Sequence, residues 1–319
     1  MDAFAPASAA YRLVPVLENI AIARDTYRLR LGDATMAQAI KPGQFVMIRP
    51  GPEGATDPLL GRPLALYEVV RDPTGTPSAF EVVYLVVGRG TAALSERKPG
   101  ERIAVWGPLG NGFGPPTAGP IILVAGGIGQ TPFLALGRWW LGQADYGDEP
   151  AQLRHHARES NSPGQDARPT LDGASSRQPR TFSSAITMLY GVRTAALLAG
   201  VDDFRRAGIE VELATDDGTA GHHGYVTDVL ARRLKRGDRP ARVVGCGPPA
   251  MLATLAKIVQ EYDVPCEVSL ENHMACGFGA CFSCVAPIRQ PDGSSDLRRV
   301  CVEGPVVSAD LVDWPRLIH

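Results

Sequence analysis

The sequence predicts a β + α/β protein, with an antiparallel β-barrel, then a parallel-sheet α/β domain, then a C-terminal cysteine segment. Short alternating strands separated by turn signals fill residues 11–107, which favours a small barrel. Beyond residue 120, apolar strands alternate with helical stretches, as in a parallel sheet. Four cysteines then gather near the end. We expect the three domains at residues 10–115, 116–265 and 266–319.

Composition and charge are those of an ordinary globular protein. Of 319 residues, 45% are hydrophobic and 21% charged, and the net charge is −2. This balance gives no sign of nucleic acid or an anionic membrane as a partner. Residues 1–6 lack the regions of a signal peptide, and glycines and Pro132 break the most apolar run, 121–137. We therefore expect a cytoplasmic protein whose cysteines bind metal.

The barrel strands are predicted by period-two alternation. Residues 26–31 and 44–49 alternate apolar and polar side chains, with Lys41-Pro-Gly43 as the turn between them. Residues 81–87 and 102–106 are expected to be further strands. With no long helical pattern among them, these strands favour an antiparallel barrel.

The α/β domain begins with a continuous apolar run at 121–125, typical of a strand buried on both faces. Further strands are expected at 186–190, 209–213 and 242–245, and helices at 131–140, 225–235 and 250–262. A polar stretch at 143–184 predicts a loosely ordered surface insertion. His155 and His156 within it are more typical of a solvated loop than of a metal site.

A flavin site is predicted on the barrel. Arg62 before Pro63 presents a guanidinium that can clamp a pyrophosphate. Tyr84 on a neighbouring strand can stack or hydrogen-bond, and the segment from Gly88 opens a helix whose N-terminus favours phosphate. Each feature alone is common in structural roles, but together they predict flavin contacts. The expected contacts are Arg62, Pro63, Leu64, Ala65, Val83, Tyr84, Leu85, Gly90 and Thr91.

These segments, with Pro42-Gly43-Gln44-Phe45 before them, resemble the flavin domain of the ferredoxin reductase superfamily. The resemblance implies that Arg62-Pro63-Leu64-Ala65 holds FAD. Ala65 stands where serine is commoner, so backbone N–H groups would replace a hydroxyl at the isoalloxazine.

A nicotinamide site is predicted where a glycine-rich turn, 126–131, follows the first buried strand and opens a helix. The turn lacks the strict dinucleotide fingerprint, and a tight structural turn is the alternative. In the superfamily this segment lines the NAD(P) site. Residues 215–218 and 245–249 are expected beside it, at the carboxyl ends of strands. The predicted contacts are Gly126, Gly127, Gly129, Thr131, Asp217, Gly247 and Pro248.

Cys246 resembles the cysteine that approaches the nicotinamide in such reductases, which makes it the candidate catalytic residue. The alternative is an inert small hydrophobe in a strand. We expect NAD rather than NADP, because after residues 190–192 only Arg193 offers a positive charge for a 2′-phosphate.

Cys276, Cys281, Cys284 and Cys301 follow the spacing C-x4-C-x2-C-x16-C, that of a plant-type [2Fe–2S] cluster. Structural zinc is the alternative, although zinc ribbons usually use two short C-x2-C pairs. Pro291-Asp-Gly293 predicts a hairpin turn that brings the fourth cysteine back to the other three. Cys266 is expected in the core.

The segment from Ser269 to Cys284, with Cys301-Val-Glu-Gly304-Pro305, resembles the electron-transfer subunits of NAD-dependent dihydroorotate dehydrogenases. The resemblance spans nearly the whole chain, apart from its first ten residues and the insertion. It implies electron flow in pyrimidine biosynthesis from dihydroorotate, through FMN in a separate catalytic subunit, to this cluster, FAD and NAD+. The assembly would be a heterotetramer.

Two other functions remain open from the sequence. One is an NAD(P)H reductase subunit that serves a hydrogenase, a ferredoxin or an oxygenase. The other is a zinc-stabilised scaffold without catalysis. No residue resembles a base for dihydroorotate, so we expect no dihydroorotate oxidation by this chain alone.

Overall fold

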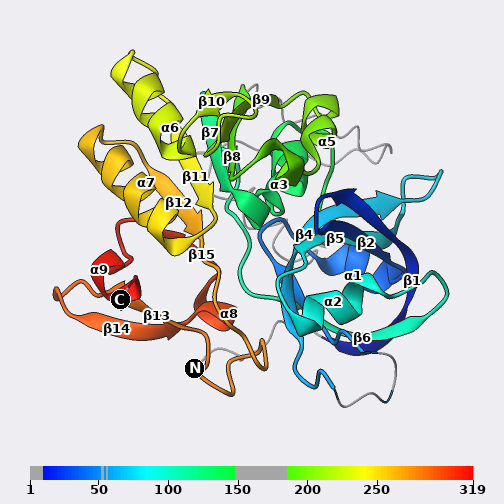
Figure 1. Ribbon diagram of the computed structural model, residues 1–319. Coiled ribbons are helices and arrows are strands. Elements are labelled where there is room, and N and C mark those ends of the chain that lie inside the picture. Colours follow the sequence, from blue (N-terminus) through cyan, green and yellow to red (C-terminus); the bar gives the residue numbers. More distant parts are fainter. Residues whose placement is uncertain (1–9, 52–53, 55–56, 148–184, 319) are drawn as a thin grey trace, which may run out of the picture.

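The structure is a computed structural model that describes residues 10–51, 54, 57–147 and 185–318. The described residues form a closed antiparallel barrel, a seven-stranded and mostly parallel sheet, and a two-stranded hairpin (Figure 1). The predicted fold class is confirmed. Nearly all of the predicted insertion, with His155 and His156, lies outside the described residues.

The barrel closes in the strand order β1-β2-β5-β4-β3-β6. Alternation along each strand sends one set of side chains inward, so that Val46 and Ile48 fill the interior. Phe45 and Met47 point outward and pack against the C-terminal part of the chain. The elements are β1 Ala10–Ala23, β2 Thr26–Leu31, α1 Ala34–Ala39, β3 Phe45–Ile48, β4 Arg62–Arg71, β5 Pro77–Leu85, α2 Arg89–Ser95 and β6 Arg102–Leu109.

Helix α1 was not predicted from the sequence. Asp33 caps it by accepting a hydrogen bond from the Met36 backbone N–H at 3.0 Å, and Met36 and Ala37 are buried. Its six residues are too few for helical periodicity to stand out.

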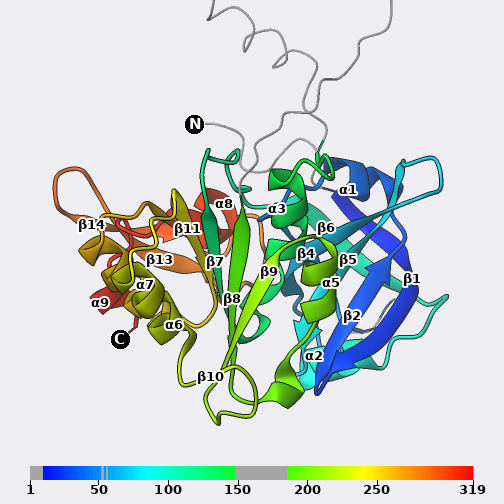
Figure 2. The ribbon, with the colours of Figure 1, turned by 90° about the horizontal axis from the view of Figure 1, so that it is seen from above.

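The α/β sheet has the order β10-β9-β8-β7-β11-β12-β15. Helices α3 and α5 lie between the sheet and the barrel, and α6 and α7 cover the other face (Figure 2). Because strands β9, β8, β7, β11 and β12 run parallel, their carboxyl ends meet at one edge of the sheet. The elements are β7 Ile121–Gly126, η1 Gly127–Gln130, α3 Phe133–Trp140, β8 Ile186–Val192, η2 Ala195–Leu197, α5 Val201–Arg206, β9 Glu210–Thr215, β10 His222–His223, α6 Val226–Lys235, β11 Arg242–Cys246, α7 Pro249–Glu261 and β12 Cys266–Ser269.

The C-terminal part contains the predicted hairpin. In the turn that joins its strands, the Gln290 N–H donates to the Ser294 carbonyl at 2.8 Å, and the Gln290 carbonyl accepts from the Gly293 N–H at 2.9 Å. Helix α8 then carries Cys301. Strand β15 pairs antiparallel with β12, so the sheet continues beyond the domain boundary expected at residue 265. The elements are β13 Val285–Arg289, β14 Ser295–Arg299, α8 Val300–Glu303, β15 Val306–Ser308 and α9 Trp314–Leu317.

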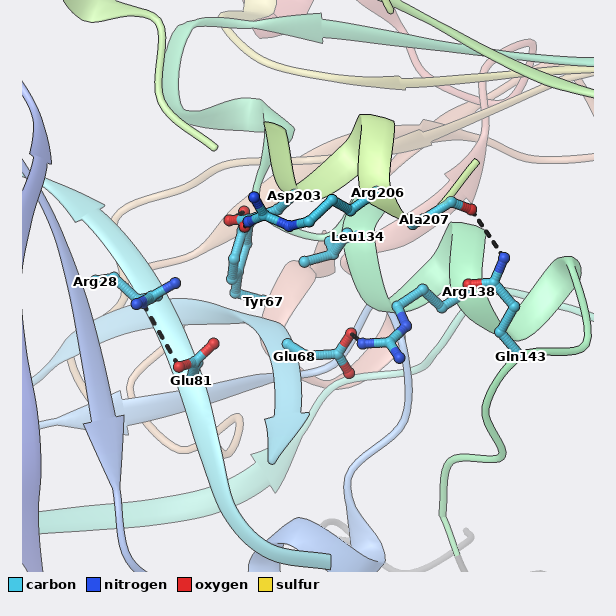
Figure 3. A pocket seen from close by; sticks show the side chains of 10 residues that line it. All are labelled: Arg28, Tyr67, Glu68, Glu81, Leu134, Arg138, Gln143, Asp203, Arg206 and Ala207. Carbon is cyan, nitrogen blue, oxygen red and sulfur yellow. Dashed lines mark hydrogen bonds and ion pairs between the residues drawn. The ribbon is translucent and has the colours of Figure 1, made fainter. Parts of the chain in front are cut away.

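Polar contacts join the barrel to the α/β domain around a cavity of about 260 Å³ (Figure 3). Arg138 on α3 donates to Glu68 on β4 at 2.9 Å, and the Tyr67 hydroxyl donates to Asp203 on α5 at 2.6 Å. Glu68 is buried, so its attraction to Arg138 is stronger than that of an exposed ion pair. These contacts fix the barrel strand β4 against the helices of the α/β domain.

No helix in the described part of the chain has both the length and the apolar character needed to cross a membrane.

Candidate redox site

The predicted pyrophosphate clamp and the predicted phosphate helix lie together. Arg62 begins β4, and its guanidinium rests against Gly90 in the first turn of α2. A Cβ atom at Gly90 would lie only 2.4 Å from Arg62 Nη2. Arg62 Nη1 also donates to the Leu60 carbonyl at 2.8 Å, which directs the side chain. The structure therefore places a cation beside glycine backbone at a helix start, which fits a phosphate group.

Thr91 supports this turn through its hydroxyl. Its hydroxyl accepts from the Val87 N–H at 2.9 Å and donates to the Gly88 carbonyl at 3.1 Å. Because both hydrogen-bonding directions of the hydroxyl are used within the chain, the side chain fixes the start of α2.

The Tyr84 ring does not take the role predicted for it. It is buried inside the barrel, stacks on Tyr27 at 5.8 Å and donates its hydroxyl proton to Asn19 at 3.1 Å. Burial raises the pKa of Tyr84 well above its ordinary value. Val83 faces the opposite way, into the core shared with the α/β domain. The prediction of a stacking ring was wrong because strand alternation turns Tyr84 inward, and Leu85 is the partly exposed residue of this segment.

The two glycine-rich turns at the carboxyl edge of the sheet pack directly on each other. Strands β7 and β11 are neighbours, with Ala125 opposite Cys246. A Cβ atom at Gly129 would lie 2.3 Å from the Cys246 carbonyl oxygen. One at Gly126 would lie 2.5 Å from Met251 Sδ and 3.0 Å from Pro248 Cδ. In the glycine turn (residues 126–131), Gly126 and Gly129 are thus required by close packing against the turn after β11.

Gln130, in the same turn, is completely buried. Within the described part of the chain, neither its amide nitrogen nor its amide oxygen has a hydrogen-bond partner. An unpaired buried amide costs roughly 1–3 kcal/mol. This orphaned group fits a turn whose polar environment is completed by something other than the chain itself.

Asp217 lies apart from this pair of turns. It follows β9, which β8 separates from β7 in the sheet. Its carboxylate accepts from the Thr219 hydroxyl at 2.6 Å and the Thr219 N–H at 3.1 Å, and these bonds lower its pKa. The structure therefore brings together the contacts predicted at 126–131 and 247–248, whereas Asp217 shapes a separate loop of the same edge.

Cys246 is buried, and burial raises the pKa of its thiol well above the ordinary value. A thiol in that state stays protonated at neutral pH, so Cys246 is a neutral hydrogen-bonding group and not a thiolate nucleophile. Its strand partner is Ser269 on β12.

Glu271 is a site residue to which the sequence reasoning gave no role. After burial, its charge is the next cause of the raised pKa of Cys246. Solvent reaches the side chain, yet desolvation by the surrounding protein raises the pKa of the carboxyl. Its position in the sequence could have indicated it, because Glu271 comes two residues after strand β12, whose carboxyl end lies at the edge where ligands bind in such sheets.

The four predicted cluster ligands influence one another's ionisation. Cys276 is among the groups that lower the pKa of Cys281, and Cys284 and Cys276 are among those that raise the pKa of Cys301. Two thiolates for each of two irons is the arrangement that a [2Fe–2S] centre requires. Among the residues that the structure describes, no three His, Cys, Asp or Glu side chains stand close enough to share one metal ion.

The environment of the thiols is asymmetric. Cys281 is exposed, and hydrogen bonds from Ser283, whose Oγ lies 3.2 Å from the sulfur, lower the Cys281 pKa to about 6. Burial, followed by the neighbouring Cys284, raises the pKa of Cys301 to about 12. In the cysteine loop (residues 276–284), Cys281 therefore faces solvent, whereas Cys284 and the more distant Cys301 are buried.

The cysteine loop packs on the outside of the barrel beside the strand that carries Arg62. A Cβ atom at Gly277 would lie 2.5 Å from Met47 Cγ on β3. Met47 pairs with Pro63 of β4 on one side and with Trp106 of β6 on the other. Strand β3 therefore contacts both the predicted flavin strand β4, by strand pairing, and the predicted cluster loop, through Met47.

Comparison with known proteins assigns the family. The family model for the iron–sulfur cluster binding domain of dihydroorotate dehydrogenase B matches residues 271–313. The chain is 33% identical over 300 residues to the electron transfer subunit of dihydroorotate dehydrogenase B (NAD(+)) from Desulforamulus reducens, covering 94% of this chain and 97% of that protein. This chain belongs to the family of electron transfer subunits of dihydroorotate dehydrogenase B.

Further matches are a second subunit of this family and two solved structures of reductases. The electron transfer subunit from Geobacillus thermodenitrificans is 32% identical over 92% of this chain and 95% of its own length. The solved structure of an NADH-dependent reduced ferredoxin-NADP oxidoreductase has 26% identity, a TM-score of 0.72, and coverage of 96% of this chain and 92% of that chain. The ferredoxin reductase of carbazole 1,9a-dioxygenase, at 20% identity and a TM-score of 0.56, shares the fold over 81% of this chain and 67% of its own.

Membership of the dihydroorotate dehydrogenase B family confirms the resemblance seen in the sequence. The chain is an electron-transfer subunit of an oxidoreductase with a ferredoxin-reductase fold. The matched family model favours iron–sulfur ligation by the cysteine segment over structural zinc.

Proposed function

We propose that this subunit passes electrons between an FMN-containing, dihydroorotate-oxidising catalytic subunit and NAD, with a [2Fe–2S] cluster and FAD as its own cofactors, in pyrimidine biosynthesis. One observation carries the proposal. Strand β3 pairs with the Arg62 strand along one edge and supports the cysteine loop through Met47. A flavin held at β4 and a cluster held by the loop would then be neighbours across strand β3.

The cofactor chemistry explains why both groups are needed. A flavin exchanges two electrons with a nicotinamide and single electrons with an iron–sulfur cluster. Arg62 would hold the FAD pyrophosphate through charge-assisted hydrogen bonds, and Thr91 keeps the start of α2 in place beside it. Ala65 has no hydroxyl, so backbone N–H groups near the start of β4 would serve the isoalloxazine.

The carboxyl edge of β7 and β11 would hold the nicotinamide cofactor. The turns at 126–131 and 247–248 provide closely packed backbone for a dinucleotide, and Cys246 with Glu271 borders them. The loops after β8 and β9 contain Arg193 together with the acidic pair Asp216 and Asp217. That charge balance disfavours a 2′-phosphate, which supports NAD over NADP.

The partner would dock at the cysteine loop. Phe278 is 46% exposed and Phe282 is 60% exposed, and both lie within the loop. Large apolar side chains exposed beside a redox group are typical of a protein interface. The family resemblance extends this contact to a heterotetramer with the catalytic subunit. Four cysteines at cluster spacing are typical of a reducing compartment, so we place this assembly in the cytoplasm.

The first experiment tests the cofactors and the division of labour. The chain purified anaerobically should show flavin bands over broad iron–sulfur absorption, and NADH should reduce a dye in its presence. It should not oxidise dihydroorotate until the catalytic subunit is added. A colourless zinc protein, or dihydroorotate turnover by the chain alone, would contradict the proposal.

The second experiment tests the docking surface. Replacing Phe278 and Phe282 with serine should weaken binding of the catalytic subunit without removing the cluster or dye reduction. Leu17→Ser is the matched control, because Leu17 is 47% exposed on β1. Equal binding by both variants would move the interface elsewhere.

A reductase that serves ferredoxin is the second candidate, favoured by the structural match over 96% of the chain. Pull-down from the native host followed by identification of the stoichiometric partner separates the two candidates. A partner that oxidises dihydroorotate supports the first, and a partner that lacks this activity but reduces or oxidises ferredoxin supports the second.

A further inference from the structure

Trp106 lies between the two predicted cofactor sites. It stands on β6, opposite Met47 of β3 and opposite Tyr11 of β1. Residues that pair across antiparallel strands point to the same face, so these side chains share the outer face of the barrel. The Tyr11 ring stacks on the indole with its centroid 6.1 Å away and an interplanar angle of 26°. The indole is therefore held on both sides along the row.

One edge of the indole holds the cysteine loop. Trp106 Nε1 donates a hydrogen bond to the carbonyl oxygen of Cys276, the first predicted cluster ligand, at 2.8 Å. The bond joins residues 170 positions apart in the chain. It meets the loop immediately before Gly277, whose φ of +81° lies in the left-handed region. A flexible glycine beside a ligand residue makes an external anchor important for the position of that ligand.

The six-membered ring of the indole, on the side next to the N–H, meets the start of the flavin strand. A Cβ atom at Gly61 would lie 2.5 Å from Trp106 Cη2 and 3.0 Å from Cζ2. Gly61 directly precedes Arg62. One rigid ring thus contacts the residue next to the predicted FAD clamp and, through its N–H, the residue that supplies the first cluster thiolate.

We propose that Trp106 is a positioning residue that fixes Cys276 relative to the flavin strand and so sets how fast electrons pass between the two cofactors. This inference deepens the proposed function and rests on it. The indole touches the backbone of both sites and reacts with neither cofactor. Its contribution is geometric: it holds the loop at one distance from β4 and limits the motion that Gly277 allows.

The test uses the full chain with its cofactors. Trp106→Phe keeps an aromatic ring against Gly61 but removes the N–H donor. After rapid mixing with NADH, flavin reduction should keep its rate, and the following cluster reduction should slow about tenfold, as small misplacements of reacting groups do. Loss of one hydrogen bond should also make iron release to a chelator about fivefold faster. The electron paramagnetic resonance spectrum of the reduced cluster should shift.

Trp314→Phe is the matched control. Its Nε1 also donates to a backbone carbonyl, that of Ala309, at 2.9 Å, and Trp314 is likewise partly buried. This variant should leave both reduction phases and the resonance spectrum unchanged. Equal behaviour of the two variants, or slowing of the flavin phase by Trp106→Phe, would overturn the proposal.

Gly61→Ala gives a second approach if Trp106→Phe does not fold. The added methyl group must displace the indole while the N–H remains, and the cluster phase should slow as in Trp106→Phe. Unchanged cluster reduction would also overturn the proposal. A wild-type chain that binds neither flavin nor cluster would instead refute the proposed function, so the two failures are distinguishable.

Discussion

The glycine turn and the cysteine loop are both rich in glycine, but their glycines serve different purposes. In the glycine turn, Gly129 lets two backbones meet, with the Cys246 carbonyl where a side chain would begin. The cysteine loop is instead held by side chains: Trp106 donates to the Cys276 carbonyl, and Arg299 donates to the Gly279 carbonyl at 3.3 Å. The first site is shaped by main-chain packing and the second by anchors from elsewhere.

This difference indicates where each site is vulnerable. A backbone contact cannot relax without moving a strand of the sheet, so the glycine turn should tolerate no added atom at its closest approach. A loop held by side chains can shift, so it should lose its ligand geometry before the chain loses its fold.

The largest effect is expected for Gly129→Ala. Its Cβ would overlap the backbone of Cys246 and Gly247, and overpacking of this kind costs about 3 kcal/mol or more. Gly127→Ala, in the same turn, meets no atom within 4 Å and bears only the left-handed strain of its φ of +56°, about 1 kcal/mol. Thermal unfolding and the Kd for NADH measure the contrast. Similar losses in both variants would show that backbone packing does not define the turn.

The next effect separates packing from backbone strain in the cysteine loop. Gly277 and Gly293 have nearly equal φ values, +81° and +83°, but a Cβ at Gly277 meets Met47 and one at Gly293 meets nothing. Both alanine variants bear the strain, and Gly277→Ala adds about 1–3 kcal/mol of overpacking. We expect iron content to fall in Gly277→Ala and to stay complete in Gly293→Ala. Full iron in both would mean that the contact with β3 is dispensable.

A smaller and more selective effect is expected at the flavin clamp. Gly90→Ala pushes the Arg62 guanidinium aside, and because that group ends a flexible side chain, stability should hardly change. FAD should bind about tenfold more weakly, since hydrogen bonds to charged groups contribute 1.5–3 kcal/mol or so. Gly88→Ala meets no atom within 4 Å and should bind FAD normally. Flavin fluorescence titration of the deflavinated chain measures the FAD affinity. Equal FAD affinities of Gly90→Ala and Gly88→Ala would show that Arg62 does not hold the flavin.

The smallest effect concerns Glu271. Desolvation raises the pKa of its carboxyl in the folded chain above the ordinary 4.5, so ionisation of this group opposes folding. The cost is absent below pH 4.5 and grows as the pH rises through the folded-state pKa. Glu271→Gln should therefore become more stable than the parent chain as the pH rises from about 5 to 8. The gain is small because solvent reaches the side chain. If Glu271→Gln were less stable than the parent chain near pH 8, the ionised Glu271 carboxylate would have to have a favourable partner.

Much of the fold was predictable because its signals are local. The strand at 26–31 was predicted within the bounds of β2, and the apolar run at 121–125 is β7 without its last residue. Period-two alternation and burial on both faces are written in neighbouring residues. The short helix α1 carried too little periodicity. The continuation of the sheet through β15 depends on pairing with β12 across nearly forty residues, which no local pattern encodes.

For the site, the sequence by itself determined which chemistry is present. The spacing of Cys276, Cys281, Cys284 and Cys301 indicates a cluster, and the Arg62 and glycine motifs indicate a flavin and a nicotinamide. Only the tertiary structure decided how these parts meet. It turned Tyr84 into the barrel, brought the charge of Glu271 to act on Cys246, and put Trp106 in contact with both Gly61 and Cys276. The physical reason is that ligand type follows from side-chain chemistry, whereas the distance and orientation between sites depend on packing between segments far apart in the chain.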